Sequence, residues 1–133
     1  MGVPTRFVLL LCLLACGGCK KEKSTNELIA DLRSSQEGDR IKAVRILPQR
    51  EGDAARIVPA LIESLKDKQG DVRWSAAIGL GYFGEEARDA IPALQAAQRD
   101  RDPRIREAAG KALSRINSTR FPAETQAKRA PGK

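Results

Sequence analysis

The chain repeats itself at a fixed offset of 33 residues, and this period constrains its fold more strongly than any other feature. The clearest mark is an arginine that recurs at Arg40, Arg73 and Arg106. Periods of this length are typical of stacked units that each contain two helices. Residues 26–116 are therefore expected to form one repeat domain. Three further sets keep the same offset: Leu28, Leu61 and Leu94; Ala43, Ala76 and Ala109; and Leu47, Leu80 and Leu113.

Within the central repeat, the apolar positions predict two helices separated by a turn. Residues 53–65 show the 3.6-residue spacing of one buried helix face. Pro59 lies inside this pattern, so the helix either begins near Val58, with the proline in its first turn, or is kinked at the proline. Residues 66–70 break the helix, and residues 71–84 predict the second one. Its packing face carries Val72, Ala76, Leu80 and Phe83.

Short motifs recur at equivalent places in the second and third copies. The second copy contains Ile57-Val-Pro-Ala-Leu61, Asp67, Val72-Arg73, Ala76-Ala77 and Leu80-Gly81, and the third contains Ala90-Ile-Pro-Ala-Leu94, Asp100, Ile105-Arg106, Ala109-Gly110 and Leu113-Ser114. This pattern resembles HEAT repeats, specifically the phycobilisome-lyase-type HEAT-like repeat. The resemblance implies an all-α fold, a short right-handed α-solenoid of about three HEAT-like helix pairs (six helices). The first copy departs most, as expected of an end repeat.

Aspartate and arginine flank the predicted turns, six residues apart, in the pairs Asp67/Arg73 and Asp100/Arg106, and Arg40 occupies the same register in the first copy. The HEAT resemblance implies an Asp/Arg ladder that ties the turns of adjacent repeats together. The alternative is an anionic-ligand site formed by the three arginines. We favour the structural role, because a ladder already accounts for two of the arginines with an acidic partner.

The remaining face of the second helix is a candidate partner-binding site. In the central repeat it carries Trp74, Ile78 and Tyr82 at helical spacing, which include the chain's single Trp and single Tyr. The resemblance implies that this helix lines a concave surface, where a protein or peptide would bind. The alternative is that Trp74 belongs to the core. The equivalent positions carry Ile41, Arg45 and Gln49 in the first repeat and Glu107, Lys111 and Arg115 in the third.

The N-terminal residues predict export and lipid attachment. The apolar run at residues 7–15 would reach about 14 Å as a helix, too short for a hydrocarbon core of about 30 Å. Residues 1–15 have the layout of a signal peptide. Leu13-Leu-Ala-Cys16 resembles the bacterial lipobox, which implies cleavage before Cys16 and lipid on that cysteine, with Cys19 as the second choice. Residues 16–25 would then be the lipidated N-terminus and a polar tether to a bacterial membrane, on its periplasmic or cell-surface side.

Two other interpretations of this segment stay open. Cys16-Gly-Gly-Cys19 could be a redox or metal pair, although the chain has no His and no second pair of this kind. Alternatively, a wrongly assigned start site would make the segment untranslated.

Positive charge is concentrated near the ends of the chain. The whole sequence has 24 Lys and Arg against 17 Asp and Glu, a net charge of +7, whereas residues 26–116 contain 16 basic and 15 acidic side chains. The repeat domain is thus nearly neutral, which disfavours nucleic-acid binding. Residues 117–133 are expected to form a disordered basic tail.

The sequence lacks the residue patterns that enzymes commonly need. It contains no His, no Gly-rich phosphate loop after a strand, and no Ser or Cys with a base partner. We therefore expect no catalysis, cofactor or metal, and interpret the chain as a membrane-anchored protein–protein interaction or scaffold module. The alternatives are a nucleic-acid-binding helical-repeat protein and an accessory subunit of a lyase-like enzyme. The partner's identity and the oligomeric state stay open.

Overall fold

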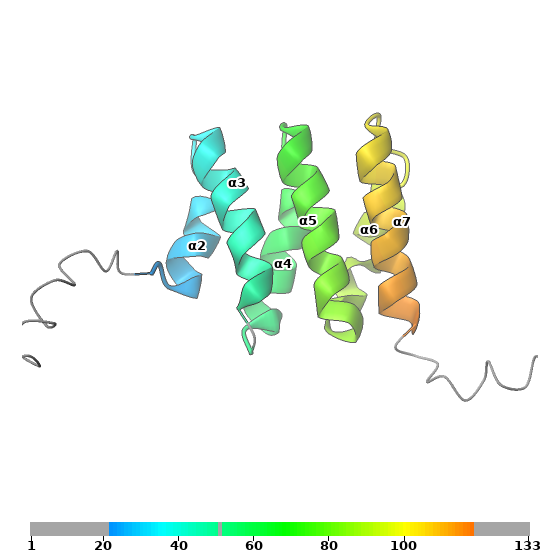
Figure 1. Ribbon diagram of the computed structural model, residues 1–133, viewed down its shortest axis with the longest axis horizontal. Helices are drawn as coiled ribbons and strands as arrows, with labels where there is room; N and C mark the ends of the chain where they lie inside the picture. Colours follow the sequence, from blue (N-terminus) through cyan, green and yellow to red (C-terminus); the bar gives the residue numbers. More distant parts are fainter. Residues whose placement is uncertain (1–21, 51, 119–133) are drawn as a thin grey trace, which may run out of the picture.

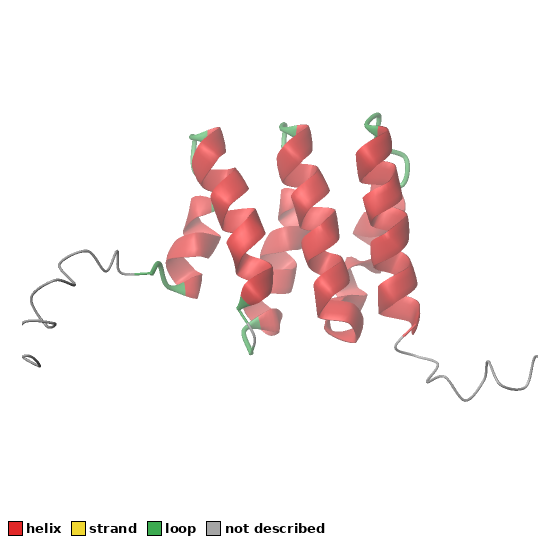
Figure 2. Cartoon of the chain, in the orientation of Figure 1, coloured by secondary structure: helices red, strands yellow, loops and turns green. Residues whose placement is uncertain are grey.

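The computed structural model describes residues 22–50 and 52–118. These residues form helices joined by short turns, and they contain no strand (Figures 1 and 2). Two 3-10 helices, η1 (Leu47–Gln49) and η2 (Gly84–Ala90), follow α3 and α5. The α-helices are α2 (Thr25–Asp31), α3 (Glu37–Ile46), α4 (Ala54–Ser64), α5 (Gly70–Phe83), α6 (Ile91–Ala97) and α7 (Pro103–Ser118).

The helices form two layers, and each repeat contributes one helix to each layer. In Figure 1, α3, α5 and α7 lie side by side in front of α2, α4 and α6. The central helix α5 contacts α3, α7 and its own repeat partner α4. The predicted short solenoid of three helix pairs is therefore confirmed, and its middle repeat is α4/α5.

The residues that recur every 33 positions form the core, because they face the neighbouring helices in each layer. Leu61, Leu80 and Leu94 are fully buried, as is Ala76. Leu113 is the exception and is only half-buried; it lies on α7, the last helix of the described residues. Aliphatic side chains and alanines fill this core, in keeping with the chain's aromatic content of 4%.

The folded region extends slightly beyond residues 26–116 at both ends. Thr25, placed in the tether from the sequence, is the first residue of α2, because Ser24 caps the helix. The Glu27 N–H donates to Ser24 Oγ at 3.3 Å, and the Ser24 N–H donates to Glu27 Oε2 at 2.7 Å, which together form a capping box. At the other end, α7 includes Asn117 and Ser118, the first two residues of the predicted tail.

The predicted signal peptide, Cys16, Cys19 and residues 119–133 of the predicted tail lie outside the described residues.

Pro59 lies inside α4, which begins at Ala54, so the proline is not in the first turn. Proline has no backbone N–H and cannot donate to the carbonyl of Ala55. Its counterpart Pro92 lies in the first turn of α6. The difference arises because the residues before Pro92 form η2, in which Ala87 departs from helical φ and ψ angles.

Candidate functional site

An Arg–Asp ladder joins the turns that precede α3, α5 and α7. Arg73 is 9% exposed, and its Nε and Nη2 donate to the two carboxylate oxygens of Asp100 at 2.8 and 3.2 Å. Its Nη1 donates to the backbone carbonyls of Asp67 and Lys68 at 2.8 and 3.2 Å. One guanidinium group therefore ties the turn of its own repeat to the turn of the next.

Arg40 makes the same set of contacts one repeat earlier. Its Nε and Nη2 donate to the carboxylate of Asp67 at 2.8 and 3.3 Å. Its Nη1 donates to the carbonyls of Ser34 and Ser35 at 2.9 and 3.3 Å. The repeated sequence register thus produces a repeated three-dimensional contact.

Each aspartate of the ladder is also held by its own turn. Asp67 Oδ1 accepts a hydrogen bond from the Gln69 N–H at 2.8 Å, and Asp100 Oδ1 accepts one from the Asp102 N–H at 2.9 Å. The hydrogen bond from Arg73 lowers the pKa of Asp100 below its ordinary value, and burial, which acts in the opposite direction, offsets only part of this effect. Asp100 is therefore ionised at neutral pH.

Arg106 occupies the third position of the ladder. Its Nη1 donates to the carbonyls of Asp100 and Arg101 at 3.0 and 3.1 Å. Its side chain is exposed, and no acidic side chain within residues 22–50 and 52–118 pairs with it. The alternative of an anion site shared by three arginines is disfavoured, because Arg40 and Arg73 each already hold a protein carboxylate on a different turn.

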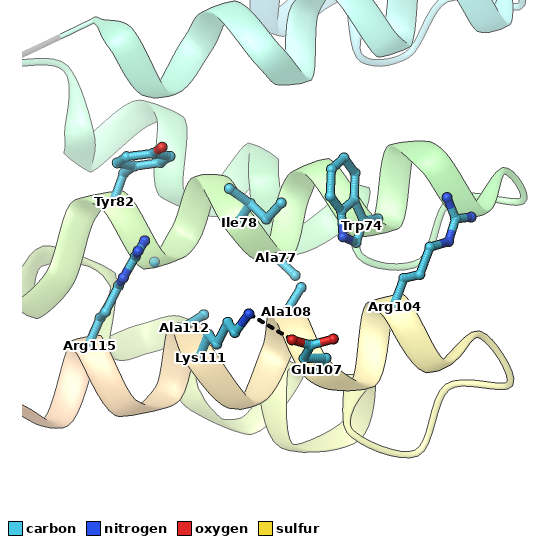
Figure 3. A pocket seen from close by; sticks show the side chains of 11 residues that line it. Trp74, Ala77, Ile78, Tyr82, Arg104, Glu107, Ala108, Lys111, Ala112 and Arg115 are labelled. Carbon is cyan, nitrogen blue, oxygen red and sulfur yellow. Dashed lines mark ion pairs between the residues drawn. The ribbon is translucent and has the colours of Figure 1, made fainter.

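Three side chains of the candidate strip project from α5 toward the surface (Figure 3). Trp74 and Ile78 are half-buried and pack against the core, whereas Tyr82 is 70% exposed. Trp74 therefore combines the two roles considered from the sequence, because it contacts the core and also lines the surface grooves on either side of α5.

A groove of about 380 Å³ separates the strip from α7. The α7 wall presents four charged side chains, and small residues lie between the two helices (Figure 3). Two of the four charged residues pair with each other, since Lys111 Nζ lies 2.7 Å from Glu107 Oε1. Arg104 pairs with Asp71 at 3.3 Å and with Asp102 at 2.8 Å.

The last charged residue of this wall, Arg115, makes a different contact. Its guanidinium carbon lies 5.6 Å from the centre of the Tyr82 ring, a cation–π distance. No carboxylate within the described ranges pairs with Arg115. The cations beside Trp74 are thus paired with carboxylates, whereas the groove is positive beside Tyr82.

A second groove, of about 400 Å³, lies between the strip and the α3 side of the molecule. Arg45, Pro48 and Gln49 line it together with the same three side chains of α5. Arg45 is exposed and has no acidic partner in the part of the chain that the structure describes. The strip is therefore a ridge with a groove on each side.

Glycines in α5 let both neighbours approach the ridge closely. A Cβ atom added at Gly79 would lie 2.8 Å from Pro48 Cγ, and one added at Gly81 would lie 3.3 Å from Ala112 Cβ. Larger side chains at these positions would push the α3 and α7 sides away from α5. The two glycines therefore allow Pro48 and Ala112 to pack close to α5 on opposite sides, near Tyr82.

Most residues proposed from the sequence for partner binding meet at this site: Arg45, Trp74, Ile78, Tyr82, Lys111 and Arg115 line one or both grooves. Ile41 is half-buried and lines neither groove. Arg104 was not identified from the sequence. The available signal was its register, since it stands 33 residues after Asp71, with the opposite charge, and the two side chains pair in the structure.

The described residues contain no group of three or more His, Cys, Asp or Glu side chains that could hold a metal ion. Within the same ranges, no helix has the length and apolar character needed to cross a membrane.

Comparison with known proteins identifies the family of this fold. A family model described as HEAT repeats matches residues 58–127, which is more than half of the chain. No curated protein matches the sequence. The match includes α5 and α7, the two helices that form the groove beside Trp74 and Arg115, and it agrees with the stacked helix pairs seen in the structure. The chain belongs to the HEAT repeat family.

Proposed function

We propose that this protein is a non-catalytic protein-binding module whose binding surface is the ridge of Trp74, Ile78 and Tyr82 with its two grooves. HEAT repeats generally mediate protein interactions. The observation that carries the proposal is the combination of exposed aromatic surface with grooves on both sides of one helix. Aromatic side chains flanked by grooves are typical anchors for a protein partner.

Photo-crosslinking tests this proposal. A photoreactive phenylalanine analogue placed at Tyr82 keeps an aromatic side chain at an exposed position, and Gln95, exposed on α6 in the other layer, serves as the control. Irradiation of cells that produce each variant should give a covalent protein adduct from position 82 and none from position 95. Equal adducts from both positions, or none from position 82, would contradict the proposal.

We further propose that the protein is exported and lipid-anchored through Cys16. Support comes from Leu13-Leu-Ala-Cys16 at the end of an apolar segment, followed by Lys20 and Lys21, which would favour an anionic membrane surface.

We also propose that the repeats are of the phycobilisome-lyase type, on the basis of their motif pattern. This assignment carries no lyase activity with it.

Membrane fractionation with mass measurement of the mature N-terminus tests the anchor. We expect a membrane-bound chain that begins at lipid-modified Cys16, and a Cys16→Ala variant that is neither cleaved at this position nor lipidated. A mature chain that begins at Cys19 would move the lipid site. A soluble, full-length wild-type chain would refute the anchor.

A further inference from the structure

Charge is distributed unequally along the α5 ridge. Near Trp74, the cations of the α7 wall are paired with carboxylates: Arg104 with Asp71 and Asp102, and Lys111 with Glu107. These two cations and three carboxylates leave the Trp74 end without an unpaired cation, so an apolar segment could cover it without burying a free positive charge.

At the Tyr82 end, two arginines come from opposite sides of the ridge. Arg45 lines the groove on the α3 side, and Arg115 lies against the Tyr82 ring on the α7 side. Both are exposed, and neither has a carboxylate partner within residues 22–50 and 52–118. Arginine forks in such positions bind carboxylates through charge-assisted hydrogen bonds.

The close packing at the glycines sets this arrangement. Because Gly79 lets Pro48 approach and Gly81 lets Ala112 approach, the helices that carry the two arginines lie close to α5 on both sides. The arginines therefore flank a single exposed aromatic ring.

We propose that this end of the ridge binds a carboxylate of the partner protein, so that the partner supplies an acidic side chain beside Tyr82 and an apolar side chain over Ile78 and Trp74. This inference rests on the function proposed above. Charge complementarity argues for an acidic segment from another protein. The chain's own residues 119–133 contain Arg120, Lys128, Arg129 and Lys133 against Glu124. Because this segment has a net positive charge, the two arginines would repel it. A second copy presenting the same face would be repelled in the same way.

The test uses the full-length protein and two sets of synthetic peptides. Both sets contain one phenylalanine in otherwise randomised sequence, and the positions that flank it are Asp in one set and Asn in the other. Trp74 is the chain's single Trp, so its fluorescence reports binding at the ridge directly. We expect the Asp set to bind at least about tenfold more tightly than the Asn set at low salt.

An Arg45→Gln/Arg115→Gln variant should bind both sets equally weakly. Arg56→Gln/Arg99→Gln is the control, because it removes the same charge from exposed positions outside the grooves and should keep the preference for Asp. Thermal unfolding of both variants checks that they are folded.

Three results would overturn the proposal: equal binding of the two peptide sets by the wild-type chain, loss of the preference in the control alone, or no response to either set. A single-stranded oligonucleotide that outcompetes the Asp set and depends on Arg45 and Arg115 would also overturn it, by assigning the arginines to phosphates. None of these outcomes decides whether the ridge binds a protein, because crosslinking at Tyr82 tests that separately.

Discussion

The two ends of α5 use arginine in opposite ways. At its first turns, Arg73 is buried and each of its nitrogens donates to a carboxylate or a carbonyl. At its last turn, Tyr82 is flanked by Arg45 and Arg115, which are exposed and have no carboxylate partner in the described parts of the chain. The arginine at the first end recurs every 33 residues, whereas the residues at the second do not recur in kind.

This contrast separates residues that stabilise the repeat fold from residues that are particular to this protein. A buried guanidinium that already donates to a carboxylate and to two backbone carbonyls stabilises the stack and is not accessible to a partner. An arginine held at the surface without a carboxylate adds little stability and keeps its donors for recognition. Variants at the two ends of α5 should therefore affect different measurements.

The largest expected effect on stability comes from removing one carboxylate of the Arg–Asp ladder. Asp100→Ala leaves Arg73 largely buried without its carboxylate and should lower the free energy of unfolding by about 3 kcal/mol in urea titrations. Arg106→Ala, at the exposed end of the same ladder, should cost about 1 kcal/mol or less. Equal decreases in the free energy of unfolding for the two variants would contradict the distinction between the buried and the exposed arginines of the ladder.

Removing the two aromatic rings of the ridge, one at a time, should show which ring contributes to the free energy of unfolding and which contributes mainly to binding. Trp74→Ala removes a half-buried ring and should cost about 2 kcal/mol. Tyr82→Ala removes a 70% exposed ring and should change the free energy of unfolding by about 0.5 kcal/mol or less while weakening partner binding. A large stability loss from Tyr82→Ala would place that ring in the core instead.

Alanine substitutions at two glycines should have opposite effects on stability, because only one of the glycines lies in a close contact between helices. Gly79→Ala would place a Cβ 2.8 Å from Pro48 Cγ and 3.2 Å from Leu61 Cδ1 and should destabilise the protein by roughly 1–2 kcal/mol. In α7, a Cβ at Gly110 meets Gln98 Nε2 at 3.6 Å, an ordinary contact. Gly110→Ala should therefore stabilise the helix by up to about 1 kcal/mol. Thermal unfolding of both variants would show shifts of opposite sign.

Two buried serines provide a smaller comparison. Within the described residues, Ser75 Oγ is buried without a hydrogen-bond partner, so Ser75→Ala should stabilise the protein by about 1 kcal/mol. Ser64 Oγ donates to the Ala60 carbonyl at 3.0 Å, and Ser64→Ala should lose a similar amount. A loss of stability in Ser75→Ala would reveal an interaction of that hydroxyl.

The smallest expected effect is on the pH dependence of stability. The folded state lowers the pKa of Asp100, so its ionised form contributes stability above the ordinary value of 3.8, and this contribution is lost as the pH falls through the folded pKa. Urea titrations below pH 5 should show a shallower pH dependence for Asp100→Asn than for the wild type. Glu107→Gln is the control and should change the pH dependence less. The pKa of Glu107 is also lowered, by Lys111, but this side chain is 67% exposed and solvent weakens the ion pair.

The 33-residue period predicted the helix pairs and most of the core, because these depend on local spacing within each helix. The HEAT resemblance implied an Asp/Arg ladder, but spacing along the sequence placed Asp67 with Arg73 and Asp100 with Arg106, whereas in the structure Arg40 pairs with Asp67 and Arg73 with Asp100. The period could not show that Arg106 has no carboxylate partner within residues 22–50 and 52–118, because the partner of each ladder arginine lies in the next turn along the stack. Nor did it show that Arg104 pairs with Asp71, since the pairing depends on how α5 and α7 align.

The sequence by itself thus determined a stack of helix pairs, since apolar side chains spaced at 3.6 residues must be buried against neighbouring helices. Only the tertiary structure decided which charged side chains find partners, because those partners lie on other helices at distances that packing sets. The approach permitted by Gly79 and Gly81 brings Arg45 and Arg115 to Tyr82, while the turns supply carboxylates to Arg40 and Arg73 instead. The same residue type is structural at one end of α5 and available for recognition at the other.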